Sequence, residues 1–422
     1  MPFMMLKIKT YKLYGAFLLV FLASMSLYSQ SATSNGSPYS LYGLGYYNPN
    51  SIGLAPSMSQ SGLAWNNPYF INDLNPATLS GLYSDIFILD AGVNVSINEL
   101  SNSGNSKTFL QSNLSHFSLA TKLNKKSGVS LSLLPATSVG YSFISEPLAV
   151  EGANEEYRNL FIGSGGINEL KFSYGYQIGT NINLGITTSY LFGKIEQSRY
   201  SATSVSELAI EEDYYYNGVK LGLGGTANIS KDLTFGAIVN FPTKVNAKKN
   251  IDVYKTTDGI SSVVEDENDV GADNFYMPLH VGTGLTYSLK SDFLFNLDFN
   301  HKFWDATDQK DNLGTFVDQS IYSLGMQYKN SNPNKYWEYF SFRSSVKYDS
   351  GYLMIDDMRM DNFEATMGVG IPLGRNFSSL NISYSRRFTS GAASNSVIQE
   401  NLNTINIGLS LSDIWYQKLK YK

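Results

Sequence analysis

The sequence predicts an all-β protein, a transmembrane antiparallel β-barrel of about fourteen strands with an N-terminal plug, or hatch, inside its lumen. Three observations lead to this fold class. Segments of roughly ten residues alternate between apolar and polar side chains, which is the period of a β-strand. The connections between these segments are alternately short and long. The composition, with 30 tyrosines, 24 phenylalanines and 36 glycines but only 12 prolines, suits strands and turns rather than helices.

The first element, residues 1–30, has the form of an export signal. Lys7, Lys9 and Lys12 precede an apolar run at 13–23, and small residues follow it. The run is too short for a spanning helix, so we expect the segment to be removed after export; the alternative is a short membrane anchor. The sequence has no cysteine, which excludes a lipid-modified cysteine, disulfides and thiol chemistry. An export signal together with the predicted membrane barrel indicates the outer membrane of a Gram-negative bacterium as the location.

The second element, residues 31–85, has scattered glycines, serines and prolines and only a weak period. It contains a short helix start at Asn75, Pro76 and Ala77, where the asparagine caps free amides and proline suits the first helical position. The segment is too apolar to hang free in the periplasm, and a barrel of this size would otherwise enclose an open lumen. We therefore predict that it folds inside as a plug; the alternative is a disordered leader.

The third element, residues 86–422, is the predicted barrel. In Phe293–Phe303 one face is mainly apolar and the other mainly polar, and Asn181–Phe192 repeats this pattern. A soluble sandwich would turn the apolar face inward, whereas a membrane barrel turns it outward to lipid. Strand length, small polar residues on the second face and aromatic pairs near strand ends, such as Phe303-Trp304 and Trp415-Tyr416, favour the barrel.

The order of connections supports a closed barrel with both ends at the periplasm. Six short turns alternate with seven long loops, as short periplasmic turns and long outer loops do in such barrels. The predicted strands lie near 86–97, 114–123, 128–144, 167–178, 181–193, 218–229, 233–242, 280–289, 293–303, 319–329, 337–348, 363–373, 379–388 and 403–412.

Several motifs resemble the FadL-type outer-membrane transporters. They are Gly53-Leu54, Ser61-Gly62-Leu63-Ala64 and Asn75-Pro76-Ala77-Thr78-Leu79 in the plug segment, which is similar to the N-terminal hatch of that family. The stretches 37–45 and 400–418 resemble a Bacteroidota branch of it. The resemblance implies a fourteen-stranded barrel with a hatch that carries hydrophobic compounds such as long-chain fatty acids. One departure is the basic tail that runs on to Lys422, where many outer-membrane barrels end on an aromatic residue.

Pro135 interrupts the predicted third strand. Proline removes a hydrogen-bond donor, and a closed barrel has no edge, so Pro135 implies a bulge or an opening. In the family that the motifs resemble, substrate leaves sideways where the third strand is kinked. We therefore predict a lateral opening at Pro135, Ser138 and Gly140; the alternative is a harmless bulge.

The sequence offers no catalytic arrangement, so we expect no enzyme activity and no cofactor. The only histidines, His116, His280 and His301, are far apart in sequence, and no nucleophile elbow or zinc spacing occurs. Asp298 and Lys302 share one face of a strand and are expected to form a charge pair in the lumen. The acidic stretch 265–269 with Asp273 fails calcium-loop spacing and is expected to be a solvated outer loop.

The predicted function is passive uptake of a hydrophobic small molecule, entering above the plug and leaving near Pro135. The expected partners are this ligand, outer-membrane lipid and lipopolysaccharide, and the barrel-assembly machinery; the net charge of −5 argues against nucleic acid, and we expect a monomer. The alternative function is a non-transporting FadL-like component of a protein secretion or surface-attachment complex. A porin for polar solutes is disfavoured by the plug.

Overall fold

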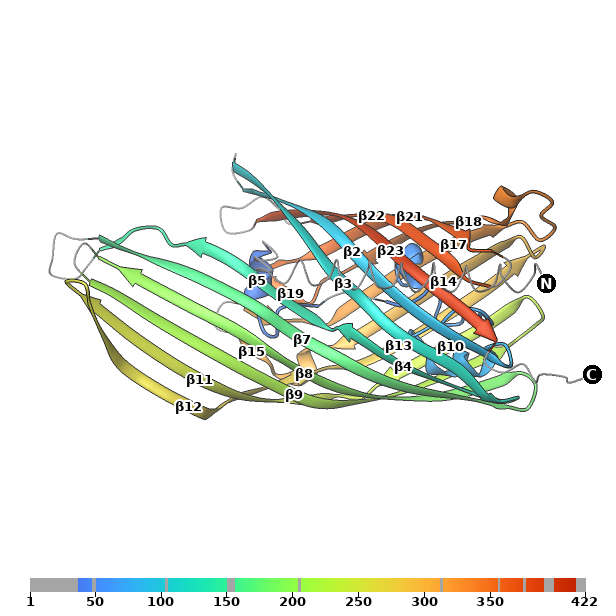
Figure 1. Cartoon of the computed structure of the whole chain (residues 1–422), viewed down its shortest axis with the longest axis horizontal. Helices are drawn as coiled ribbons and strands as arrows, with labels where there is room; N and C mark the ends of the chain where they lie inside the picture. Colours follow the sequence, from blue (N-terminus) through green and yellow to red (C-terminus); the bar gives the residue numbers. More distant parts are fainter. Residues whose placement is uncertain are drawn as a thin grey trace, which may run out of the picture. The chain divides into compact units, whose positions relative to one another are not determined.

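The computed structural model describes residues 37–47, 51–102, 105–149, 156–203, 206–311, 314–355, 357–374, 377–390 and 398–414. The predicted signal peptide and the basic C-terminal tail lie outside these residues. The predicted fold class is confirmed: fourteen wall strands form a closed antiparallel barrel (Figure 1). No helix in the described part of the chain is long and apolar enough to cross a membrane.

Each wall strand pairs with its neighbours in sequence, and the last strand pairs with the first. β23 runs beside β2 from Ile86↔Ile414 to Ser101↔Gln399, which closes the ring. Three wall strands are interrupted and carry two labels each. The strands are β2 (Ile86–Asn102), β3 (Asn105–Asn124), β4 (Ser127–Pro135) with β5 (Thr137–Ile144), β7 (Glu156–Ile178), β8 (Ile182–Ala202), β9 (Ser206–Asn228), β10 (Leu233–Asn240) with β11 (Thr243–Thr257), β12 (Ile260–Met277) with β13 (Leu279–Leu289), β14 (Phe293–Phe303), β17 (Gln319–Lys329), β18 (Ser341–Asp349), β21 (Asp361–Pro372), β22 (Ser379–Ser390) and β23 (Gln399–Ile414).

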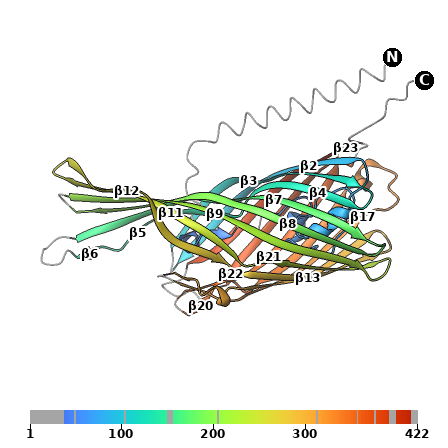
Figure 2. The same ribbon diagram turned by 90° about the horizontal axis from the view of Figure 1, so that it is seen from below.

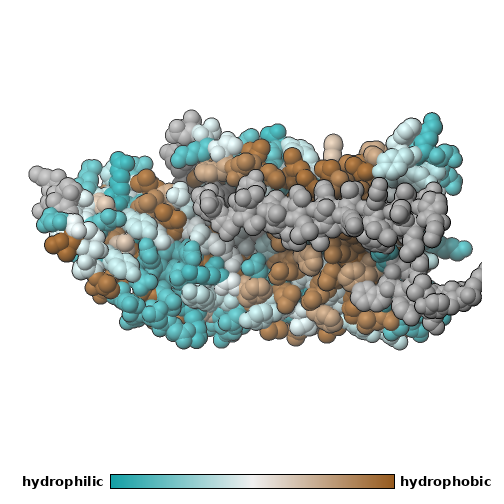
Figure 3. All heavy atoms as spheres, viewed as in Figure 1, coloured by the Kyte–Doolittle hydropathy of each residue, from teal (hydrophilic) through white to brown (hydrophobic). Residues whose placement is uncertain are grey.

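The apolar faces of these strands point outward, as a lipid environment requires. On β14 the side chain of Leu297 is 55% exposed, whereas its neighbours Asn296 and Asp298 are buried in the lumen. The same inversion holds on β8, where Leu184 is exposed and Asn183 is buried. Figure 3 shows, on the face in view, hydrophobic side chains along the barrel wall and a mostly hydrophilic surface toward the outer end.

Several of the predicted long loops are wrong, because the chain there continues as strand. The described residues of 98–113 belong to the hairpin of β2 and β3, those of 194–217 belong to the hairpin of β8 and β9, and 243–279 contain the hairpin of β11 and β12. We call the outer parts of β7, β8, β9, β11 and β12 the outer wing; it extends well beyond the rest of the wall (Figure 2). Both faces of a sheet outside the membrane meet water, so the alternation that marks a membrane strand fades there.

Short elements fill the lumen and its outer mouth. The plug, defined here as residues 37–83, contains η1 (Pro38–Leu41), β1 (Tyr46–Tyr47), η2 (Ala55–Met58) and η3 (Pro76–Gly81). The outer connections contain β6 (Leu148–Ala149), η4 (Asp305–Thr307), β15 (Lys310–Asp311), β16 (Gly314–Phe316), β19 (Leu353–Ile355) and β20 (Met358–Arg359). At the opposite end, η5 (Tyr336–Tyr339) occupies the start of a predicted strand, so β18 begins later than expected, at Ser341.

Candidate ligand cavity and wall break

The short helix η3 fixes the lower plug to the barrel wall. Asn75 precedes it, and its Oδ1 accepts the Ala77 N–H at 3.1 Å, as the sequence pattern predicts for a helix cap. The side-chain Nδ2 of Asn75 donates to the carbonyl of Leu63 at 2.8 Å and to that of Gly225, on β9, at 3.0 Å. The buried Asn75 therefore holds the helix, the plug loop before it and the wall together.

Glycines on four adjacent wall strands make room for η3. A Cβ added at Gly224 of β9 would lie 2.2 Å from Asn75 Oδ1, and one at Gly185 of β8 would lie 2.5 Å from the Ala77 nitrogen. Gly175 on β7 and Gly128 on β4 make equally close approaches to the backbone of the helix. The helix lies directly against the wall because these positions lack side chains. The contact between η3 and these glycines was not predicted from the sequence, although the glycines recur at lumen-facing positions of successive strands.

Two lumen carboxylates bind plug backbone amides. Oδ2 of Asp298, on β14, accepts the N–H groups of Gly62 at 2.5 Å and Leu63 at 3.0 Å. The predicted charge pair between Asp298 and Lys302 is therefore wrong, because the Asp298 carboxylate binds plug amides instead. The alternation of residues along the strand does not show this contact. On the opposite wall, Oδ1 of Asp90 accepts the Gly53 N–H at 3.3 Å.

The three histidines occupy three separate positions. His116 is buried beside Asp90, with 2.5 Å between Nε2 and Oδ1. His280 lies between Asn240 and Asn300, each at 3.0 Å. His301 contacts Ser320 at 2.9 Å near the outer end of β14. Each is accounted for by a local polar network.

The wall is interrupted beside Pro135, the residue that sequence analysis singled out. Pairing between β3 and β4 ends at Phe117↔Leu133, and Pro135 ends β4. The chain continues as β5, which pairs with β7 up to Ile144↔Leu160. In the described ladder β5 has no pairing with β3; its other neighbour is the plug strand β1. The backbone ladder of the barrel is thus open between upper β3 and β5.

The two other residues predicted at an opening lie on β5, against the plug. Ser138 pairs with Tyr46 of β1, and the Gly140 N–H donates to Oγ of Ser40 at 3.1 Å. The plug strand β1 therefore occupies the edge of β5 that faces the break. β1 has only two residues, too few to show a strand period, so the sequence does not predict it.

A cavity of about 350 Å³ lies above the plug and reaches the break. Leu134, Pro135 and Ala136 line it on the side of the break, and Tyr46 and Tyr47 line it from the plug. Its remaining wall is part apolar and part charged. The apolar part includes Ile238, Met277, Trp304 and Tyr352, and the charged part includes Glu169, Lys171, Lys220, Lys302 and Lys347.

Most of the cavity's cations are neutralised locally. Lys220 lies 2.6 Å from Glu169, and Lys171 lies 3.5 Å from Asp73. Among the described residues, Lys302 has no carboxylate oxygen within 4.0 Å of its Nζ. Arg387 also lines the cavity without an ion pair among the described residues, but its guanidinium donates to the Tyr46 hydroxyl. Lys302 is therefore the cation in this cavity best placed to meet an anionic group of a ligand.

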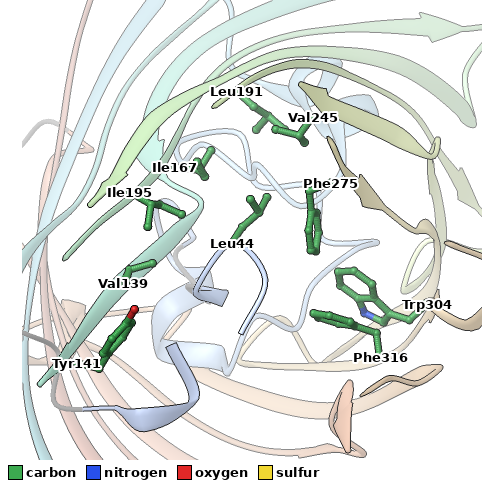
Figure 4. Close-up of a cluster of buried hydrophobic side chains, with 10 residues drawn as sticks. All are labelled: Leu44, Val139, Tyr141, Ile167, Leu191, Ile195, Val245, Phe275, Trp304 and Phe316. Atoms are coloured by element: carbon green, nitrogen blue, oxygen red, sulfur yellow. The ribbon is translucent and has the colours of Figure 1, made fainter. Parts of the chain in front are cut away.

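An aromatic and aliphatic cluster forms the outer wall of the cavity. Leu44 of the plug lies at its centre, surrounded by side chains from β5, β7, β8, β11 and β12 (Figure 4). Trp304 is buried there and stacks on Tyr352, with ring centroids 5.5 Å apart. Its Nε1 has no hydrogen-bond partner within the described structure. The cluster joins the upper plug to the base of the outer wing.

Comparisons with known proteins agree with this architecture. The model of the BamG family matches residues 8–422. The solved structure of the Pseudomonas putida toluene transporter TodX superposes with a TM-score of 0.61 at 13% identity, covering 88% of this chain and 100% of that one. A Pseudomonas aeruginosa FadL homologue gives the same values. The CymD monoaromatic hydrocarbon channel gives 0.59 at 15% identity, covering 87% and 99%. At these identities the likeness shows the fold. No curated protein matches the chain.

Proposed function

This chain belongs to the BamG family, and from that membership and the geometry above we propose that it takes up a hydrophobic small molecule passively. The ligand is an amphiphile of the long-chain fatty-acid type. The protein acts in the outer membrane of a Gram-negative bacterium, after removal of a signal peptide at 1–30. We assign residues 31–85, which include the plug, to the N-terminal hatch and residues 86–422 to the barrel. Structural neighbours described as a monoaromatic hydrocarbon channel and a toluene transporter support a hydrophobic cargo in general.

One observation carries the proposal: the cavity above the plug ends at the break in the wall. An apolar tail would contact Leu134, Met277 and Trp304, and an anionic head group would meet Lys302. Transfer of the tail out of water supplies roughly 25 cal/mol per Å² of buried apolar surface. The tail then leaves between β3 and β5 into the membrane, which requires β1 to move away from β5. Such a route needs no cofactor and no ATP.

A reversible disulfide bond between β1 and β5 tests the proposed exit route. Tyr46 and Ser138 are direct partners across β1 and β5, so Tyr46→Cys with Ser138→Cys places two thiols at cross-strand distance in a chain that has no other cysteine. In proteoliposomes, we expect the oxidised variant to stop uptake of a fluorescent long-chain fatty acid and reduction to restore it. Equal uptake in both redox states would show that β1 is not on the route.

A matched control places the same bond in the closed part of the wall. Ser118 and Ser132 are partners across β3 and β4, and both face the lumen. Ser118→Cys with Ser132→Cys should leave uptake unchanged on oxidation. Fatty acid that copurifies with the native protein, identified by mass spectrometry, provides an independent check of the ligand class.

A second candidate function, a component of a protein secretion or surface-attachment complex, is favoured by the outer wing. The wing presents two long hairpins outside the membrane band, and their exposed side chains are largely polar. A transporter of small molecules does not need so large an outer surface, whereas a protein partner does. Native mass measurement of the complex from mild detergent separates the two. A protein complex with an empty lumen favours this second function, and a monomer with bound lipid favours uptake.

A further inference from the structure

Two strands present long unpaired backbone edges at the outer end of the barrel. β12 pairs with β11 on one side, and residues 260–274 have no partner strand on the other within the described structure. Residues 105–116 of β3 pair with β2 on one side, and above Phe117 no described strand pairs with them on the side of the break. In Figure 1 the β2–β3 hairpin turns away from β5 and β7 above the break.

The β12 edge is protected against the addition of another strand. Glu265, Asp266, Glu267, Asp269 and Asp273 place negative charge along it. Its register with β11 shifts at three points, which bends and twists the edge. Charged residues and bulges are the usual means by which proteins prevent edge-to-edge pairing. Both are present on β12.

The β3 edge has almost none of this protection. Residues 105–116 contain no proline, no glycine and one formal charge, on Lys107. The register with β2 is unbroken from Asn102↔Asn105 to Val93↔Leu114, and the one shift in this segment comes at its lower end, between Leu114 and His116. Alternate residues of such a strand turn their N–H and C=O groups toward the open side, over a length of roughly 40 Å at about 3.3 Å per residue.

We propose that the upper edge of β3, residues 105–116, binds an extended segment of a partner polypeptide as an added β-strand. A strand supplies alternating donors and acceptors along the whole edge, whereas the phosphate or sugar groups of lipids cannot match that spacing. The inference goes beyond the proposed uptake and does not depend on which compound is carried. The added strand would occupy the gap between upper β3 and β5, so partner binding and lateral exit exclude each other.

The side chains of β3 define what the partner strand should look like. Leu110 is 71% exposed on the outer face, whereas Gln111, Asn113 and Ser115 line a polar cavity of about 100 Å³ on the lumen side. Directly opposed residues of paired strands lie on the same face. The partner segment should therefore alternate between apolar residues that face outward and small polar residues that face the lumen.

Photo-crosslinking in cells tests both the partner and its conformation. A photoreactive phenylalanine analogue replaces Thr108, Leu110 or Ser112 in turn, with Val264 of β12 as the matched control on the protected edge. We expect the three β3 sites to label one polypeptide and Val264 to label none. Because paired strands keep a fixed register, moving the probe by two residues along β3 should move the labelled residue of the partner by two. Adducts with lipid alone, labelling without this order, or equal labelling from Val264 would overturn the proposal.

A binding measurement on the purified full-length protein gives a second, independent test. The probe is a twelve-residue peptide of alternating valine and threonine, compared with the same peptide N-methylated at alternate residues. N-methylation removes the donors of one edge, so we expect roughly tenfold weaker binding. Leu110→Lys should weaken the unmodified peptide similarly, and Val264→Lys should not. Equal binding of the two peptides, or binding of neither, would overturn the proposal; heat-modified migration on gels confirms that each variant is folded.

Discussion

Gly224 and Gly225 are neighbours on β9, but their side-chain positions face opposite sides of the wall. A Cβ at Gly224 would collide with Asn75 of the plug, whereas one at Gly225 would meet Leu184 Cδ2 at an ordinary 3.5 Å. We predict that Gly224→Val displaces η3 and costs on the order of 1–3 kcal/mol of unfolding free energy. Gly225→Val should be nearly neutral. Denaturant unfolding in detergent measures the unfolding free energy of both variants. Equal losses would contradict the close contact between η3 and Gly224.

Asp298 provides a second test at the residue scale, because it accepts two plug amides. Asp298→Leu leaves both buried amides without an acceptor, at about 1–3 kcal/mol for each unsatisfied group. We therefore predict a looser plug and a higher single-channel conductance in planar bilayers. Asp298→Asn keeps one acceptor oxygen and should have a smaller effect. Asp292→Asn, in a short turn at the opposite end of the wall from the wing, is the control and should leave conductance at the native value.

At the scale of elements, the sequence predicts the membrane-crossing parts of the strands well and the outer parts poorly. Inside the band one face meets lipid and the other the lumen, so Leu297 and Asp298 alternate clearly in the sequence. In the outer wing this contrast is absent, and the acidic stretch of β12 resembles a loop. Pro135 ends β4, as expected for a residue that lacks a ladder donor; that the wall opens there for a ligand stays a prediction. The strand that fills the edge of β5, β1, could not be predicted, because its pairing depends on how the plug docks.

The outer wing is held in part by ion pairs that should weaken in acid. A hydrogen bond from Lys194 lowers the pKa of Glu196, with a further contribution from Ser164. A carboxylate whose pKa is lowered by folding adds stability above its unfolded pKa, and this stability is lost as pH falls through the folded pKa. Hydrogen exchange near 194–197 should therefore speed up below that lowered pKa. The effect should be small because both side chains are exposed.

Glu196→Gln provides the control for this pH dependence. It removes the titrating group, so the acid-induced change in exchange at this position should shrink in the variant. An unchanged acid response would assign the effect to other carboxylates of the wing.

At the scale of the whole molecule, the fold follows from one inversion: apolar side chains outside and polar ones inside. Leu297 stands in the middle of β14 and faces outward. We predict that Leu297→Arg costs about 2–4 kcal/mol in a lipid bilayer, as charged residues on the lipid face do near the midplane. Reversible unfolding in bilayers measures this cost. An effect near zero would place Leu297 outside the hydrocarbon region.

The cavity, in contrast, could not be assembled from the sequence. Its lining comes from the plug, from both sides of the wall break and from strands as distant as β4 and β22. Lys302 and Trp304 lie two residues apart, but nothing in their spacing shows that they share a cavity with Pro135. The motifs in the plug segment indicate the fold family, and the ligand class depends on contacts that only the docked plug creates.

The claim that the cavity opens sideways at the wall break is tested most directly by mapping a photoreactive long-chain fatty acid after its uptake into outer-membrane vesicles. We expect adducts on cavity residues such as Leu134 and Met277, together with adducts on the edges of β3 and β5 beside the break. Adducts spread evenly over the lipid-facing strands, with none in the cavity, would contradict it.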